Sequence, residues 1–435
     1  MAKKKKAPLT KAQKAAKGRL ALYVILAILL GIGLIYATIT LINAESVSSL
    51  MELAVKFNTA EYAEGEQLVP VLDDDGDWCF VTDGDFTVMQ LTDVHIGGGI
   101  ASAQKDIWAM NAVASMVTTD KPDLVVVTGD VAYPVPFSSL TFNNFGPAKV
   151  FAAMMDKLGV YWTLAFGNHD TEAYSYYTRE QISAYYAEVA KESKYFLYQE
   201  GPKNVDGCGN QVIKVKGTDG VVTQAIVTLD SHSYTDGDVI GIMWKYDNIH
   251  QNQVDWYANK IAKINTDNRA INPSAADVKS LAFFHIPLVE YRDAWAELST
   301  AEVNKDKKVS EYQDTENVKY IDGDKNEDSG INPLANNGET YGVFCGMGED
   351  NLFETGSQIG LQGVFCGHDH KNNFSVEYKG MRLTYGMSVD YLAYAGIWNQ
   401  KAQRGCTLIT IKHDGSFSTM RSNYYQDKYK AESKQ

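Results

Sequence analysis

Five short segments of the chain contain the residue types that bind divalent metal ions. Carboxylate, amide and imidazole groups are the donors that suit divalent first-row metals. Five of the eight histidines fall in these segments, so histidines and acids are concentrated together. The segments are Asp93-Val94-His95, Gly129-Asp130, Gly167-Asn168-His169-Asp170, His285 and Gly367-His368-Asp369-His370. Together they predict a metal centre assembled from distant parts of the chain.

The spacing inside the segments supports this interpretation. Asp93 and His95 are two residues apart, as are His368 and His370, and this spacing puts both side chains of a pair on one face of an extended strand. Taken singly, each segment also fits a structural role, since Gly-Asp is a common turn pair and a lone histidine is often structural. The metal centre is favoured because all five segments occur together.

Apolar, β-branched runs precede most of these segments. Such runs predict buried strands, and apolar periodicity predicts helices over residues 101–118 and 149–158. Alternating strands and helices of these lengths indicate parallel βαβ units. In open α/β sheets, ligands bind at the carboxyl ends of the strands, where the segments would lie. The predicted strands span residues 85–91, 123–128, 161–166, 280–284 and 359–366.

The second half of the chain is less regular. Residues 300–340 are polar and predict a loop or an insertion. The strands near the carboxyl terminus alternate in polarity and are expected to be antiparallel. Further helices are predicted at 177–193 and 254–264, and further strands at 196–198, 211–215, 223–230, 374–378, 381–385, 406–412 and 417–420.

The amino terminus predicts a membrane anchor. Residues 20–43 are apolar and would span about 36 Å as a helix, at about 1.5 Å per residue, which is enough to cross a bilayer. Eight Lys or Arg residues and no acids precede them in residues 1–19. Because positive charge stays in the cytoplasm, residues 45–435 are expected outside the cytoplasmic membrane. The alternative is a signal peptide that is cleaved to release a secreted protein.

Charge and cysteine content narrow the classes of partner and scaffold. The net charge is −14, and subtracting the eight basic residues of the amino terminus leaves −22 on the rest of the chain. So acidic a domain disfavours nucleic acid as a partner. Five cysteines in 435 residues are too few for a disulfide-rich scaffold, with one or two disulfides left open, and none has metal-ligand spacing. The acidic run at residues 73–77 is only a weak calcium-loop candidate.

The order of the five segments resembles that of the calcineurin-like metallophosphoesterases, and the residues around His285 and His368 are similar to a purple-acid-phosphatase-like subgroup. The resemblance covers roughly residues 85–390. It implies two divalent ions, of manganese, iron or zinc, and an α/β sandwich with two mixed central sheets flanked by helices. It assigns Asp93, His95, Asp130 and His370 to one metal, and Asp130, Asn168, His285 and His368 to the other.

The resemblance also separates the catalytic residues from the ligands. It implies that His169 lies beside the phosphate and is oriented by Asp170, without binding metal. One departure from the true purple acid phosphatases concerns Tyr133, which in that group binds ferric iron where a glycine stands in place of His95. We expect His95 to be the ligand here and Tyr133 to be a packing residue.

The expected organisation is a basic tail (1–19), a transmembrane helix (20–43), a juxtamembrane stalk with a first strand (44–84) and a metallophosphoesterase domain (85–425) with insertions around 171–284 and 288–360. The expected reaction is hydrolysis of a small phosphomonoester by a hydroxide held between two ions, with His169, protonated through Asp170, stabilising charge or protonating the leaving group. A phosphodiesterase or nucleotide pyrophosphatase would use the same core. A surface-binding module with a structural metal site is the alternative of another class.

Overall fold

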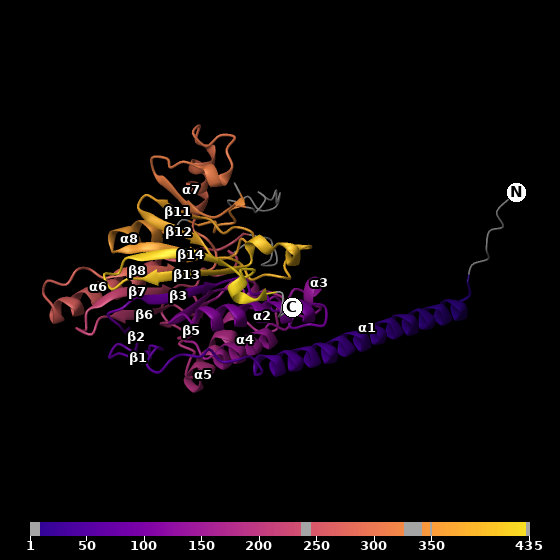
Figure 1. Cartoon of the computed structure of the whole chain (residues 1–435). Coiled ribbons are helices and arrows are strands. Elements are labelled where there is room, and N and C mark those ends of the chain that lie inside the picture. The colour runs from indigo at the N-terminus through magenta and orange to yellow at the C-terminus, as the bar shows by residue number, and fades with distance from the viewer. Residues whose placement is uncertain (1–8, 236–244, 326–341, 349, 432–435) are drawn as a thin grey trace.

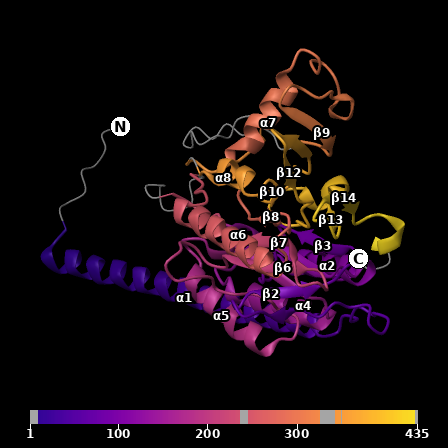
Figure 2. The same cartoon turned by 90° about the vertical axis from the view of Figure 1, so that its left-hand side faces the viewer.

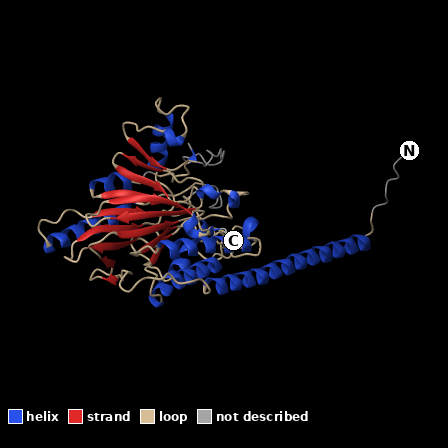
Figure 3. Ribbon diagram, viewed as in Figure 1, coloured by secondary structure: helices blue, strands red, loops and turns tan. Residues whose placement is uncertain are grey.

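Two β-sheets form the centre of the molecule, and helices cover their outer faces (Figures 1 and 3). The computed structural model describes residues 9–235, 245–325, 342–348 and 350–431. Within these residues, each sheet contains both parallel and antiparallel strand pairs. The predicted α/β sandwich with two mixed sheets is therefore confirmed, and a long apolar helix precedes it.

The smaller sheet contains the first three predicted βαβ strands. β3, β4 and β5 are parallel neighbours, and β13 pairs with β3 and β14 in antiparallel fashion. Parallel order requires crossover connections, which α2 (Ala103–Asp120) and α4 (Phe145–Leu158) provide. The strand order is β14 (Phe417–Asn423), β13 (Gly405–Ile411), β3 (Phe86–Leu91), β4 (Leu124–Thr128) and β5 (Trp162–Ala165).

The larger sheet extends well beyond the predicted core. β7, β8, β10 and β12 are parallel neighbours at its centre. α6 (Gln251–Ile271) covers the outer face beside β6 and β7 (Figure 2). In order, the strands among the described residues are β1 (Val71–Leu72), β2 (Trp78–Val81), β6 (Gln211–Lys216), β7 (Val222–Thr228), β8 (Lys279–Phe283), β10 (Leu361–Cys366), β12 (Met381–Tyr385), β11 (Ser375–Tyr378) and β9 (Val318–Asp322).

A buried apolar layer joins the two sheets. Val88 and Val126 from the smaller sheet belong to the same buried cluster as Ile226, Phe283 and Phe365 from the larger sheet. β-branched and aromatic side chains of this kind fit a pleated surface. Because the layer holds the sheets against each other, loops from both sheets meet at one edge.

The region expected to be insertions contributes core elements. Within 171–284 lie α5 (Arg179–Glu192), β6, β7, α6 and β8, and 288–360 contains α7 (Val289–Thr300), β9 and α8 (Leu352–Gln358). β9 falls in the polar stretch that predicted a loop. It is an edge strand in which only Val318 is buried, so its sequence carries little apolar signal. The expected strand at 196–198 is reduced to a bridge between Trp162 and Phe196, and residues 326–340 of the polar stretch lie outside the described residues.

The amino-terminal helix does not stop where the predicted membrane segment ends. α1 runs from Lys11 to Ala54 as one helix, and a capping box at Thr10 begins it. Its apolar part is exposed and qualifies as a candidate membrane span by length and composition. Leu50 and Ala54 are buried against the domain, in the cluster that includes α2 and α4. The expected stalk therefore begins as a continuation of the helix that is packed on the domain.

The acidic run before β2 is neutralised by lysines. Lys214 Nζ lies 2.7 Å from Asp73, 3.3 Å from Asp75 and 3.0 Å from Asp77. Lys260 Nζ lies 2.7 Å from Asp77. A calcium ion would have to displace Lys214, so the run serves as an ion-pair partner of β6 and α6.

The five cysteines, all in the described part of the chain, are free thiols.

Glu290 in the first turn of α7 predicts a pH dependence of stability. Burial, together with the charge of Asp350, raises its pKa from 4.5 to about 7. Since the fold favours the neutral form, this group makes the protein less stable as pH rises from about 4.5 to 7. Glu290→Gln should therefore raise the free energy of unfolding at pH 8 by roughly 1–3 kcal/mol relative to the native chain, taking about 1.4 kcal/mol per pKa unit.

The measurement is the thermal midpoint of both proteins at pH 5 and pH 8. The gain should appear at pH 8 and shrink or vanish at pH 5, where the native carboxyl is already protonated. A gain of equal size at both pH values would show that the effect is not the titration of Glu290.

Candidate metal centre

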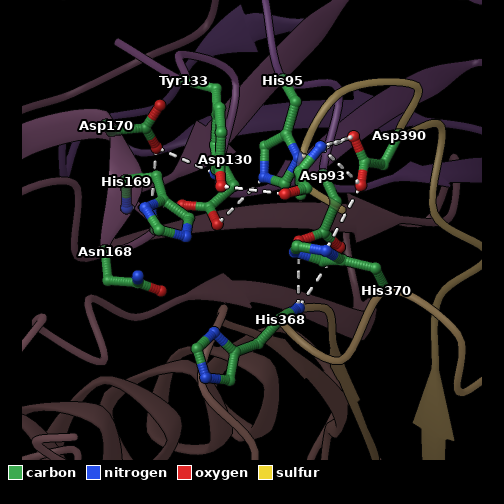
Figure 4. A network of polar contacts seen from close by, with 12 residues as sticks. Asp93, His95, Asp130, Tyr133, Asn168, His169, Asp170, His368, His370 and Asp390 are labelled. Carbon is green, nitrogen blue, oxygen red and sulfur yellow. Dashed lines mark hydrogen bonds and ion pairs between the residues drawn. The ribbon is translucent and has the colours of Figure 1, made fainter. Parts of the chain in front are cut away.

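The seven side chains predicted as metal ligands come together at the carboxyl ends of five strands. Asp93 and His95 follow β3, Asp130 follows β4, Asn168 follows β5, His285 follows β8, and His368 and His370 follow β10. The acids and histidines form two buried groups that share Asp130, namely Asp93, His95, Asp130 and His370 in one, and Asp130, His285 and His368 in the other. Figure 4 shows six of the seven labelled around one space.

Within each group, the donor atoms lie at distances that fit ligands of a common ion. Ligands bound tetrahedrally at about 2.1 Å lie roughly 3.4 Å from each other. Asp130 Oδ2 lies 3.3 Å from His95 Nε2 and 3.1 Å from His285 Nε2. One oxygen of Asp130 therefore belongs to both groups, which is the position of a bridging ligand.

The remaining pairs have the same spacing. His370 Nε2 lies 3.4 Å from Asp93 Oδ1, within the first group. His285 Nε2 and His368 Nδ1, in the second, lie 3.3 Å apart and face each other. In a buried site, two facing imidazole nitrogens need a shared proton or a shared cation between them.

Asn168 gives an independent test of whether a metal fits. Its side-chain nitrogen donates to the Tyr234 hydroxyl at 3.2 Å. Its Oδ1 atom is buried and has no hydrogen-bond partner. Leaving a buried carbonyl oxygen without a partner costs free energy, and a cation would satisfy it. The donor set of carboxylate, amide and imidazole thus fits divalent ions.

The backbone at the ligands is strained. Asp93, His95, Asp130 and His368 have φ angles of 51°, 53°, 54° and 76°, in the left-handed region. Non-glycine residues occupy this region at a cost of about 1–3 kcal/mol each, and such strain clusters at functional sites. The chain bends sharply after each strand, and the bend turns the ligand side chains inward.

Glycines before two ligands allow the loops to approach closely. Gly129 has a φ of 83°, and a Cβ atom there would lie 2.7 Å from His285 Nδ1. A Cβ atom on Gly367 would lie 1.8 Å from Thr92 Oγ1. Any larger residue would push the loop of the smaller sheet away from that of the larger sheet.

Asp390 supports two of the histidines, and the sequence did not single it out. Its carboxylate lies 3.0 Å from His95 Nδ1 and 3.3 Å from His370 Nδ1, which directs both Nε2 atoms toward the ligand group. Although burial disfavours the charged imidazole, Asp390 and Asp130 raise the pKa of His95 to about 10. The only sequence signal was its position in Ser388-Val389-Asp390, shortly after a predicted strand.

Asp170 does not orient His169, contrary to expectation. Its carboxylate accepts hydrogen bonds from the backbone N–H groups of Asp130, Ala132 and Gly167, at 2.8–3.0 Å. It therefore ties the loop after β4 to the loop after β5. The reason is geometric, since Asp170 is the middle residue of the 3-10 turn His169–Thr171 and its carboxylate faces the backbone N–H groups of both loops.

Glu172 is the actual partner of His169. Its Oε1 atom lies 2.7 Å from His169 Nδ1 and also accepts a hydrogen bond from Tyr234 at 3.0 Å. The Glu172 side chain is 3% exposed, whereas that of His169 is 21% exposed. His169 is thus held from behind while its ring remains open to a substrate.

Tyr133 lies between His95 and His169 as a packing residue. Its ring centroid is 4.5 Å from that of His95 and 4.6 Å from that of His169. Its hydroxyl donates to the carbonyl of Ala393 at 3.4 Å, away from the ligand atoms. The structure thus places His95, and not Tyr133, in the ligand group.

Beside His169 a polar cavity of about 360 Å³ opens, lined in part by Glu172, Arg179 and His232. Arg179 pairs with Asp230 and donates to the carbonyl of Gly167 at 2.8 Å, which supports the loop of Asn168. His232 also lies on this cavity. Its Nε2 atom is 3.0 Å from Gln253 Oε1.

Comparisons with known proteins agree with this geometry. Residues 86–372 match the calcineurin-like phosphoesterase family. The chain is 25% identical to "Probable inactive purple acid phosphatase 29" of Arabidopsis thaliana, over 79% of this chain and 82% of that protein. It is 26% identical to "Probable inactive purple acid phosphatase 14" of the same plant, over 74% and 75%. It is also 26% identical to "Phosphatase DCR2" of Saccharomyces cerevisiae, over 67% of this chain and 45% of that protein.

Asp390→Asn tests the support of the two histidines. Removing the negative charge behind His95 and His370 should weaken metal binding by about 10–100-fold, the usual effect of losing such a partner. The loss should concern the ion of the Asp93 group more than that of the His285 group. Competition with a chelator, followed by elemental analysis, measures both. Equal loss of the two ions would contradict the assignment of Asp390 to one group.

Proposed function

The chain belongs to the calcineurin-like phosphoesterase family, and from that premise we propose that it is an active phosphoesterase that depends on two divalent ions. One observation carries the proposal. The Asp130 oxygen lies between His95 and His285, so that two ligand groups share one atom. A shared carboxylate is what a centre with two ions requires.

The residues of the site fit manganese, iron or zinc, and Asp93, His95, Asp130, Asn168, His285, His368 and His370 would hold them. When bound, such ions supply an activated water at neutral pH and neutralise charge on the phosphoryl oxygens. Burial excludes bulk water from the ligands and strengthens their electrostatic interactions. No cysteine or serine nucleophile is needed, so the proposed reaction is direct hydrolysis of the phosphoester.

His169 is the group we assign to proton transfer or charge stabilisation. Glu172 holds its Nδ1 atom, which leaves Nε2 to donate a hydrogen bond to a phosphoryl oxygen or to the leaving oxygen. A histidine in this position contributes typically 10²–10⁴-fold to a rate. Glu172, buried behind the ring, is a positioning residue. Asp170 positions the loops that carry Asp130 and Asn168.

A phosphomonoester is the substrate class that we propose first. A phosphodiester or a nucleotide pyrophosphate is the second candidate, because the same ligand groups would serve it. The domain is proposed to lie outside the cytoplasmic membrane and to be held there by α1, since the basic residues before the apolar stretch favour the cytoplasm. Release after signal cleavage is the alternative.

A non-catalytic binding module is the candidate of another class. The names of the two plant relatives, which describe them as probably inactive, favour it. Against it stands the pair of His169 and Glu172, because a purely structural metal site has no use for a partly exposed histidine held by a buried carboxylate. The name of the yeast relative, a phosphatase, also favours an enzyme.

The decisive experiment is an assay of the full chain, reconstituted with manganese, iron or zinc, on p-nitrophenyl phosphate, bis-p-nitrophenyl phosphate and a nucleotide pyrophosphate. We expect metal-dependent release of p-nitrophenol from the monoester, abolished by a chelator. A protein that binds two ions per chain and hydrolyses none of the three would be the binding module instead.

His169→Ala should keep two ions per chain while kcat falls by roughly 10²-fold or more. Glu172→Gln should lower kcat less and leave KM unchanged, because the amide keeps the volume of the carboxylate 2.7 Å from His169 Nδ1 but not its charge. Tyr185→Phe is a control, since that side chain packs against Phe145 and Tyr186, outside the ligand groups and outside the cavity beside His169. Unchanged turnover of His169→Ala would remove His169 from the mechanism.

A further inference from the structure

α1, the helix proposed as the membrane anchor, makes direct hydrogen bonds to two of the loops that carry the candidate metal ligands. Asn43 Nδ2 donates to the carbonyl of Leu140 at 2.7 Å, and the backbone N–H of Ile100 donates to Asn43 Oδ1 at 2.9 Å. Ile100 follows His95 by five residues and Leu140 follows Asp130 by ten. Both loops lie at the carboxyl ends of β3 and β4, as the metal site does.

No flexible spacer separates the apolar stretch from the domain. The exposed apolar residues of α1 continue to Ile42, and Asn43 is already buried. About two helical turns before Asn43, the hydroxyl groups of Tyr36 and Tyr176 are hydrogen-bonded to each other. If α1 crosses a bilayer, the edge of the domain beside α3 (Pro136–Ser139) must rest at the membrane surface. Figure 1 shows α1 leaving the domain beside α3.

The surface at this edge carries exposed apolar and aromatic side chains. Phe137, at the tip of α3, is 98% exposed, and Leu140 and Tyr176 are about half exposed. A phenylalanine fully in water on a short helix is costly unless something apolar covers it. The bilayer is the apolar phase that α1 brings to this place.

A second loop beside the site has the composition of a membrane interface. Tyr394 and Trp398 are 41% and 37% exposed. Lys371 Nζ lies 5.3 Å from the Tyr394 ring and Lys105 Nζ lies 4.6 Å from the Trp398 ring. Tyrosine and tryptophan are enriched at the level of lipid headgroups, and lysine favours anionic lipid surfaces.

The second loop lies against the ligand residues and is joined to the loop that leads into α3. The Tyr394 ring lies 4.9 Å from that of the ligand His370. The bond from the Tyr133 hydroxyl to Ala393 joins this loop to the one that continues into α3. The aromatic rim and the ligand groups are therefore parts of one edge of the molecule.

A cavity lies between the anchor helix and the α3 loop. It measures about 250 Å³ and is lined mostly by apolar and aromatic side chains, among them Tyr36, Ile39, Leu140, Phe142 and Tyr176. The apolar stretch of α1 forms one wall of the cavity. If α1 crosses a bilayer, the cavity therefore lies at the depth where lipid headgroups meet acyl chains. A pocket of this composition suits the glycerol and upper acyl part of a lipid better than a sugar or a nucleotide.

We propose that the substrate is a phosphate monoester on a membrane lipid, taken from the leaflet in which α1 ends. The proposal rests on the proposed phosphoesterase function and on α1 as an uncleaved anchor. Water adds to phosphorus, the bond from phosphorus to the lipid oxygen breaks, and that oxygen takes a proton. The products are inorganic phosphate and a lipid alcohol, which stays in the bilayer.

The test uses the full chain in lipid nanodiscs with the metal that supports hydrolysis of p-nitrophenyl phosphate. Phosphatidic acid in the same nanodisc is the lipid probe, and p-nitrophenyl phosphate is the soluble probe. Phe137→Asp is the test variant, and its full exposure makes a folding defect improbable. Ile271→Asp, at the end of α6 away from this edge, is the matched control with a half-exposed apolar residue.

The native chain should release phosphate from both probes. Phe137→Asp should lower the ratio of lipid to soluble hydrolysis by about tenfold, while Ile271→Asp leaves it unchanged. Hydrolysis of the soluble probe alone by the native chain would overturn the lipid proposal and leave the proposed function standing. An unchanged ratio in Phe137→Asp would also overturn it. Failure of manganese, iron and zinc alike to support hydrolysis of either probe would refute the proposed monoester hydrolysis, and the lipid proposal with it.

Discussion

One carboxylate oxygen, Oδ2 of Asp130, lies within 3.3 Å of imidazole nitrogens that come from two different sheets. His95 follows a strand of the smaller sheet and His285 follows a strand of the larger one. Burying such charges is expensive unless each finds a partner. The two sheets must therefore meet at one edge with little freedom, and the apolar layer between them provides that.

Several other features follow from the same constraint. Four ligands adopt left-handed backbone angles, and Gly129 and Gly367 leave room for loops that almost touch. Asp390 and Asp170 then hold these loops, one through imidazole rings and the other through backbone N–H groups. Strain at the site is sustained because the surrounding sheets are well packed, as is usual at functional sites.

The amino-terminal helix α1 extends this rigidity to the outside of the domain. Asn43 is hydrogen-bonded to Ile100 in the loop after β3 and to Leu140 in the loop after β4, so the orientation of the site is linked to that of α1. A domain on a flexible stalk would meet substrates from any direction. A domain docked on its own helix presents one edge to whatever surface the helix enters, and here that edge holds both the candidate ligands and the exposed Phe137.

The sequence by itself determined the candidate ligand residues that the fold brings together, the parallel βαβ core and the apolar amino-terminal helix, because these depend on residue type and local period. The sequence did not predict β9, because an edge strand needs few apolar residues. It also did not single out Asp390 and Glu172, because nothing in a sequence distinguishes one carboxylate near a strand end from another. It also misassigned Asp170. Which acid faces which histidine depends on how the loops of different sheets pack against each other. Only the tertiary structure therefore decided that Glu172 is the carboxylate beside His169. It also decided that Asn43 of α1 is hydrogen-bonded to loops at the site.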